Sequence, residues 1–163
     1  MKRIHMINEY PKHWIIRIGD GVNFKNSKYP FWGMKKGKDG CMKSILINNV
    51  KEGDILWFCT NKANGGIAIA MAEYTVFYDR SDEPLIKINT YTNKDQNWIG
   101  DEDWSIQMHY KNLYNTEKQN IQVILRGPCP IIEYNKESSN QKNVDDLYKH
   151  YEGFKFYGEP KYT

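Results

Sequence analysis

The chain has 163 residues and carries 23 lysines and arginines against 20 aspartates and glutamates, which gives a net charge of +3. Its length is typical of a single core, so we expect residues 1–163 to form one domain. So small a net charge excludes a protein that binds nucleic acid by charge alone. The three cysteines have no metal-ligand spacing and no disulfide framework, which excludes a zinc site and a disulfide-rich scaffold.

Neither the N-terminal residues nor any later stretch has the apolar run of a signal peptide or of a membrane-spanning helix. We therefore expect an intracellular protein, in the cytoplasm or the nucleus, that has no membrane partner.

The first third of the chain contains two short apolar runs separated by turns. Residues 13–18 (HWIIRI) predict a strand that ends at a GDG turn, and residues 22–28 predict a helical turn with Asp20 as its N-cap. Residues 42–50 are apolar but fit a short helix and a short strand equally well. The continuous apolar run at residues 55–60 (ILWFCT) is typical of a strand that is covered on both faces.

The rest of the chain predicts further strands around one long polar segment. A hairpin turn at residues 61–66 leads into a strand over residues 67–77, where alternating alanines make one face small, either for close packing or to leave a cavity. Residues 80–103 are polar, and a segment of that length is usually functional or disordered. The remaining predicted elements are strands at 104–110, 121–125 and 131–134, and a helix at 144–151 with Asn143 as its cap and Asp145 and Asp146 in its first turn.

These elements define the expected fold class. About six strands and two or three short helices leave little room for βαβ crossovers. We therefore predict an α+β domain, built as a small mixed, largely antiparallel β-barrel with flanking short helices.

The chain lacks the common catalytic motifs. It has no Walker loop, no GxGxxG after a strand, no HExxH and no GxSxG. The four histidines are scattered, and the acidic run at residues 101–103 is typical of a solvated loop. We expect a protein that is not an enzyme, with no cofactor and no metal.

Tryptophans beside small and polar residues are the remaining signal. Trp32, Trp57, Trp98 and Trp104 stand next to Gly, Asn, Asp or apolar neighbours. A flat ring beside hydrogen-bonding groups suits a nucleobase, because stacking contributes roughly 1–3 kcal/mol per base. Tryptophan is equally an ordinary core residue, so position must decide between a binding cage and a core.

The order of five segments resembles a known superfamily. HWIIRIGDGVNF, PFWG, GDILWF, GGIAIAMAEY and WSIQMHY follow one another as the elements of the PUA-like superfamily do, especially in its YTH and EVE branches. The resemblance covers residues 13–115 and does not extend past about residue 116. It implies a small β-barrel that reads a modified base, which is methylated adenine in RNA for the YTH branch and a modified base in DNA for the EVE branch.

The resemblance also implies a base-binding site. Trp32, with Gly33 beside it, matches the first cage wall of the YTH branch, and Asn23 matches the residue that hydrogen-bonds the base edge. Trp98 matches the second wall, with Trp104 as the alternative. The chain departs from the YTH branch after its first strand, where Arg17-Ile18-Gly19 replaces a basic and hydroxyl pair. A basic tract near Trp32 is expected to meet phosphates through Lys25, Lys28, Lys35, Lys36 and Lys38.

Three hypotheses about function follow. The leading one is a non-enzymatic reader of a modified, methylated nucleobase in single-stranded or base-flipped RNA or DNA. The second is a PUA-like hydrolase of the ASCH kind, which processes nucleosides or nucleotides with Lys62 and Glu73. The third is a protein-interaction module whose long segment, residues 80–103, docks a partner.

Overall fold

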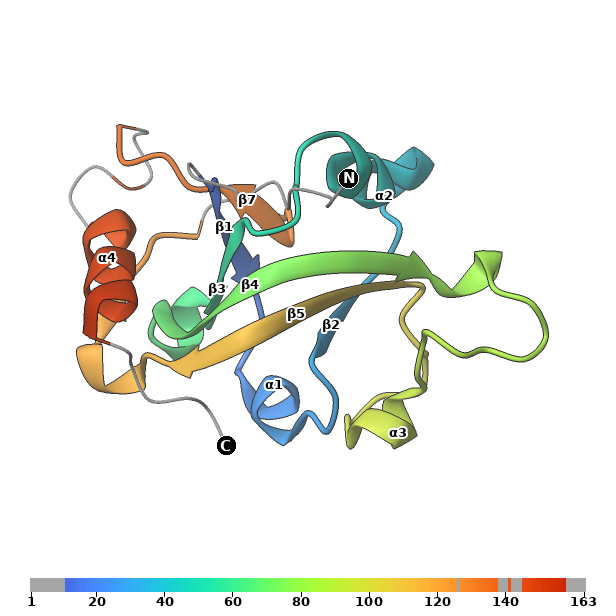
Figure 1. The fold of residues 1–163 in the computed structure, drawn as a ribbon. Helices are drawn as coiled ribbons and strands as arrows, with labels where there is room; N and C mark the ends of the chain where they lie inside the picture. The colour runs from blue at the N-terminus through green and yellow to red at the C-terminus, as the bar shows by residue number, and fades with distance from the viewer. Residues whose placement is uncertain (1–10, 126, 138–140, 142–144, 158–163) are drawn as a thin grey trace.

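The chain folds around one curled sheet, seen in a computed structural model that describes residues 11–125, 127–137, 141 and 145–157. Seven strands form the sheet in the order β2-β5-β4-β3-β1-β7, with β6 paired to β4 (Figure 1). The strands are β1 His13–Arg17, β2 Phe31–Met34, β3 Ile55–Cys59, β4 Ile67–Asp79, β5 Ile106–Asn115, β6 Ile121–Gln122 and β7 Ile131–Glu133. Every pairing is antiparallel except that of β1 with β3, so the prediction of an α+β, largely antiparallel sheet is confirmed.

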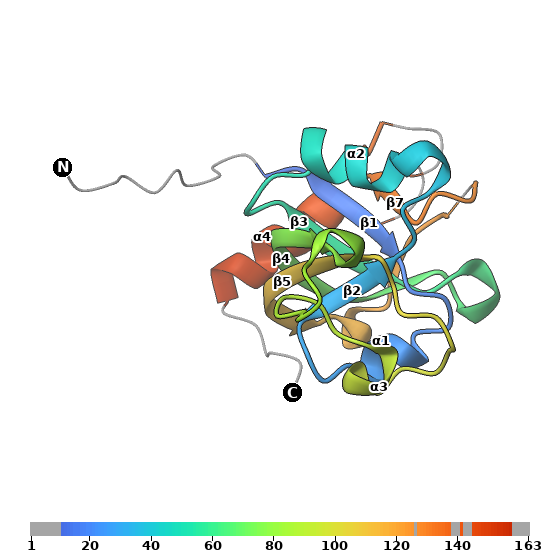
Figure 2. The same ribbon diagram turned by 90° about the vertical axis from the view of Figure 1, so that its right-hand side faces the viewer.

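The helices are short and lie around this sheet (Figures 1 and 2). The α-helices are α1 Val22–Asn26, α2 Cys41–Asn48, α3 Asn93–Gln96 and α4 Leu147–Tyr157, and the 3-10 turns are η1 Lys38–Gly40, η2 Lys62–Asn64, η3 Arg80–Asp82 and η4 Glu117–Gln119. No helix in the described ranges is both long enough and apolar enough to cross a bilayer.

The core consists of two apolar clusters on the two faces of the sheet, and β3 contributes to both. All five of its residues are buried. Leu56 and Phe58 pack into the cluster that α2 covers, while Trp57 and its alternate neighbours pack into the cluster that α4 covers. The strand is therefore covered on both faces, as its continuous apolar run predicts.

The long strand β4 carries the alternating alanines. Ala68, Ala70 and Ala72 are at most 1 % exposed. A register shift between Phe58 and Cys59 turns Ala68 toward the α4 side, whereas Ala70 and Ala72 face the α2 side. The three alanines do not share one face, because a bulge changes which face of a strand a residue occupies. All three are buried, so they serve close packing.

The apolar segment at residues 42–50 is helical as far as Asn48, where α2 ends. Met42 and Leu46, four positions apart, are both buried on one side of α2, which is the spacing of a helical apolar face.

The N-cap of α1 differs from the expected Asp20. Gly21, with φ of 84°, occupies the N-cap position, and the Asp20 carboxylate accepts a hydrogen bond from the Val22 amide at 2.9 Å.

The C-terminal predictions need correction. Helix α4 begins at Leu147, so Asp145 and Asp146 precede it and do not lie in its first turn. The Asp145 carboxylate instead accepts a hydrogen bond from the Gln122 amide at 2.8 Å, which ties the approach to the helix to β6. The expected cap, Asn143, lies outside the described residues.

His13 gives the fold a specific dependence on pH. It is 2 % exposed, and its Nδ1 accepts a hydrogen bond from Trp57 Nε1 at 2.9 Å. Burial lowers its pKa from 6.5 to about 4, against the opposing effect of Asp54 and Asp146. The unfolded chain therefore binds a proton between these two pH values that the folded protein does not bind.

We predict that the free energy of unfolding falls by about 3 kcal/mol through His13 as the pH falls from 6.5 to 4, and that this contribution is complete above pH 6.5. Denaturant unfolding across this range should show a much smaller fall in His13→Gln, whose side-chain oxygen can still accept from Trp57. His109, whose pKa burial also lowers, contributes in the same direction, so His109→Gln is the matched comparison. An equal fall in wild type and His13→Gln would contradict the assignment.

Candidate nucleobase site

The predicted cage tryptophans meet at the β2 edge of the sheet. Trp32 lies on β2 and is half-buried, whereas Trp98 follows α3 and is only 6 % exposed. Their ring centroids are 5.0 Å apart, and the ring planes are inclined by 63°. Phe24 of α1 adds a third ring, with its centroid 6.0 Å from that of Trp32. The structure thus brings together two residues that the sequence separates by the whole of β3 and β4.

Asn23 joins the same cluster from α1. Its Nδ2 donates to the Ile99 carbonyl oxygen at 3.1 Å, and its Oδ1 accepts from the Ile99 amide at 2.9 Å. These bonds fix the backbone next to Trp98. A side-chain amide has two N–H groups and two oxygen lone pairs, so one of each is left over on this half-buried side chain.

Two further contacts hold Trp98 in place. Its Nε1 donates to Ser27 Oγ at 2.9 Å, and its backbone amide donates to the Asn93 carbonyl oxygen at 2.8 Å. Its ring also packs on Phe31 at 5.1 Å between centroids. Sequence reasoning did not identify Ser27, because a lone serine before a Lys-Tyr-Pro stretch carries no signal of a distant tryptophan.

The tryptophan pair is closed in this conformation. A base stacked between two rings needs about 7 Å between them, twice the contact distance of roughly 3.5 Å between carbon atoms. Trp32 and Trp98 instead touch edge to face. They can take up a base between them only if the segment that carries Trp98 moves.

Trp104 belongs to a separate hollow. A Cβ on Gly33 would lie 2.5 Å from Trp104 Cβ, so only glycine lets the tryptophan approach β2 this closely. In the described ranges, no ring contact joins Trp104 to Trp32 or Trp98. The hollow has a volume of about 530 Å³ and is lined by Lys35, Lys36, Gly37, Glu102, Asp103, Trp104 and Ser105.

The predicted phosphate-binding lysines do not form one uniform positive patch. Lys25 pairs with Glu117 at 3.0 Å, and Lys28 lies 5.5 Å from the centroid of the Tyr29 ring. Lys35 Nζ is 3.9 Å from Glu102, and Lys36 Nζ is 3.0 Å from Asp79. Lys38 is exposed and, among the described residues, forms no ion pair. A phosphate would therefore compete with carboxylates for three of the five lysines.

Asp79 is linked to this hollow through Lys36, and the sequence did not identify it. Its side chain is 1 % exposed and lies within 3.1 Å of both Lys36 Nζ and Lys43 Nζ. It also accepts from the Ser81 amide and hydroxyl at 2.9 and 2.6 Å. Burial alone would raise the pKa of this carboxyl, but the hydrogen bonds from Ser81 and the two lysines outweigh burial and hold the pKa well below its usual range.

The residues of the hydrolase hypothesis lie apart. Lys62 is exposed in the turn before β4, whereas Glu73 lies opposite Ile55 within that strand. The seven strand residues from Ile67 to Glu73 alone span about 20 Å. The buried Cys59 thiol has its pKa raised by burial, and no group of three potential metal ligands occurs in the described part of the chain.

Comparisons with known proteins add no relationship to this geometry. No protein-family model matches the chain, and no curated protein matches it.

We predict that Asp79→Asn lowers the free energy of unfolding by about 2 kcal/mol, because it leaves Lys36 and Lys43 facing a buried neutral group. Both lysines are partly exposed, which keeps the effect below that of a fully buried pair. Asp82→Asn is the matched control: Asp82 also pairs with Lys43 but is 63 % exposed, so its loss should cost under about 1 kcal/mol. Urea unfolding of both variants tests this difference, and equal losses would contradict it.

Proposed function

We propose that the protein is a non-enzymatic reader of a modified, methylated nucleobase in single-stranded or base-flipped RNA or DNA, and that the base binds between Trp32 and Trp98. The observation that supports this proposal is the convergence of Trp32, Trp98 and Asn23 at one edge of the sheet. Two rings supply stacking surface, and the amide beside them has donor and acceptor capacity left for a base edge.

A base can bind between Trp32 and Trp98 only after the two rings separate. Trp98 is held by its bonds to Ser27 and Asn93 and by the Asn23–Ile99 pair that follows it. Each such bond contributes about 1 kcal/mol net, so displacing the segment costs a few kcal/mol. Stacking of one base on two rings returns a similar amount. The bound base therefore replaces the contact that the two rings make with each other.

Methylation shifts this balance in favour of binding. A methyl group adds a few tens of Å² of apolar surface, and enclosing it between rings contributes about 25 cal/mol per Å². The resulting preference is roughly 1 kcal/mol, or several-fold in affinity, for the methylated over the plain base. The cost of opening is the same for both bases, so it lowers both affinities and leaves this preference unchanged.

The nucleic-acid backbone would lie along the end of β2. Lys35 and Lys38 follow Trp32 within a few residues and are both exposed. The Trp104 hollow beside Lys35 offers a further ring for a neighbouring base. Lys36 pairs with Asp79 and so positions the loop that follows β2.

We predict that Trp32→Ala weakens binding of the preferred modified oligonucleotide roughly ten- to hundred-fold, through loss of stacking. The measurement is fluorescence anisotropy with end-labelled short RNA and DNA oligonucleotides that carry adenine, 6-methyladenine, cytosine or 5-methylcytosine. Trp32→Phe, which keeps a ring, should bind with intermediate affinity. Trp104→Ala is the matched control and should keep the preference for the modified base.

Circular dichroism and thermal unfolding establish that each of these variants is folded. A folded Trp32→Ala protein that binds as wild type does would rule out this site. Equal affinity of wild type for all bases would rule out a reader of modification.

We predict that Lys38→Ala weakens binding of modified and unmodified oligonucleotides by the same factor. If Lys38 contacts one phosphate, the slope of log K against log salt should become less steep by about 0.7. Lys149→Ala, an exposed lysine on α4, is the control and should leave the slope unchanged. A loss of base preference in Lys38→Ala would contradict a role limited to phosphate.

A further inference from the structure

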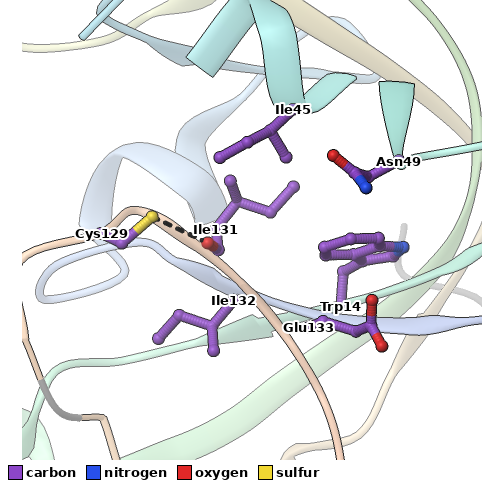
Figure 3. Close-up of a pocket in the computed structure, with 7 residues that line it drawn as sticks. All are labelled: Trp14, Ile45, Asn49, Cys129, Ile131, Ile132 and Glu133. Atoms are coloured by element: carbon purple, nitrogen blue, oxygen red, sulfur yellow. Dashed lines mark hydrogen bonds between the residues drawn. The ribbon is translucent and has the colours of Figure 1, made fainter. Parts of the chain in front are cut away.

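A second concave surface lies at the other end of the sheet, between α2 and β7. This groove has a volume of about 440 Å³. In Figure 3, Ile45 from α2 and Ile131 from β7 face each other, and the ring of Trp14 lies beside them. Asn49 and Glu133 supply the polar groups at the Trp14 end. The groove is thus mainly apolar, with one carboxylate at its rim.

The groove is bordered by an open strand edge. Pro130 and Tyr134 face β1, because the Arg17 amide donates to the Pro130 carbonyl oxygen at 3.0 Å and the Tyr134 amide donates to the His13 carbonyl oxygen at 2.8 Å. In an antiparallel pair the intervening residues, here Ile131 and Glu133, direct their backbone groups away from the partner strand. No strand of the described residues pairs with this edge of β7. Such an edge beside an apolar groove suits an added segment of chain.

The same chain carries an apolar protrusion. In the loop after η3, Leu85 is 102 % exposed, Ile86 77 % and Ile88 73 %. Three large aliphatic side chains are thus exposed within four positions, and grouped exposed apolar residues are typical of an interaction site. Lys87 lies between them and places a positive charge in the same segment.

Hydrogen bonds hold this loop in shape. Lys87 Nζ donates to the carbonyl oxygens of Arg80 and Glu83 at 3.0 and 3.4 Å. The Glu83 carboxylate accepts from the Asn89 amide at 3.0 Å and from Thr90 Oγ1 at 2.9 Å. The aliphatic side chains are therefore presented by an ordered loop, so inserting them into a partner costs little further ordering.

We propose that this loop, residues 84–88, inserts its aliphatic side chains into the groove between α2 and β7 of a second copy of the chain. In Figures 1 and 2 the loop extends away from α2 and β7, so it does not fill the groove of its own copy. Ile45, Ile131 and Ile132 line the groove, which therefore matches the aliphatic side chains of the loop, while the Glu133 carboxylate at its rim pairs with Lys12 Nζ at 3.5 Å. This inference is independent of the nucleobase proposal.

The contact has a defined symmetry. The loop and the groove are different surfaces, so each copy offers one of each. Two reciprocal contacts would close a dimer, but the loop extends away from α2 and β7 in Figures 1 and 2, so we expect a one-way contact that continues head to tail. It buries little surface, so we expect a dissociation constant on the order of 100 µM.

Sedimentation equilibrium of the full chain from about 10 µM to about 1 mM tests this expectation. The weight-average mass should rise with concentration and pass that of a dimer. A chain that stays monomeric throughout, or a mass that stops at two copies, would overturn the proposal.

Two variants separate the two surfaces. The double variant Leu85→Asp/Ile86→Asp removes the loop contact at fully exposed positions, and Ile45→Lys places a charge in the groove. Each should be monomeric alone, yet an equimolar mixture should form a dimer that grows no further, because one intact loop meets one intact groove. Ile47→Lys, the same change on the exposed side of α2, is the matched control and should associate as wild type does.

Circular dichroism tests whether Ile45→Lys is folded. If the variant is unfolded, Asn49→Lys takes its place, because Asn49 is exposed at the groove rim. A mixture that remains monomeric while wild type associates would assign the association to other surfaces and overturn the proposal.

Discussion

The packing of Trp98 against Phe31 and Trp32 is the contact on which the β2 edge of the protein depends. It ties the long segment after β4 to the edge strand, and α1 joins through Ser27 and Asn23. The same segment covers the strand edge, since the Gln96 side chain donates to the carbonyl oxygens of Tyr29 and Phe31 and accepts from the Tyr29 amide. The indole ring of Trp98 and the side-chain amide of Gln96 thereby fix the later part of this polar segment against β2.

This arrangement accounts for the contact between the two rings. Separating Trp32 from Trp98 in water would expose a large apolar surface and lose the free energy of its burial. Edge-to-face contact between the rings retains that burial. The hydrogen bonds around Trp98 add to the free energy that separating the rings would cost, so the proposed binding of a base between them depends on both contributions.

Local patterns predicted most of the strands, because β-branched and apolar runs at β1, β3 and β4 follow from side-chain burial alone. The expectation that Trp32 and Trp98 lie together came instead from a resemblance of segment order, and their ring centroids are 5.0 Å apart. Local patterns could not choose between helix and strand for α2, whose apolar residues fit both periods, and they started α4 too early. Contacts that join distant segments, such as Asp79 with Lys36 and His13 with Trp57, left no local trace. Their partners are chosen by strand register and by a bulge, which no single window of sequence contains.

The two ends of the sheet meet the same physical problem in different ways. An edge strand exposes unpaired amides and carbonyl groups, and proteins usually cover or shorten it. At β2 the Gln96 side chain performs this task, so that the edge presents rings instead of backbone. At β7 the strand is only three residues long, and Cys129 donates to the Ile131 carbonyl oxygen at 2.9 Å, which occupies one outward acceptor. Shortness limits how much of the β7 backbone can pair with another chain, so the proposed self-association would depend on the apolar groove beside it and not on an added strand. Gln96 covers part of the β2 edge and the brevity of β7 protects the other, so among the described residues both edges resist backbone pairing.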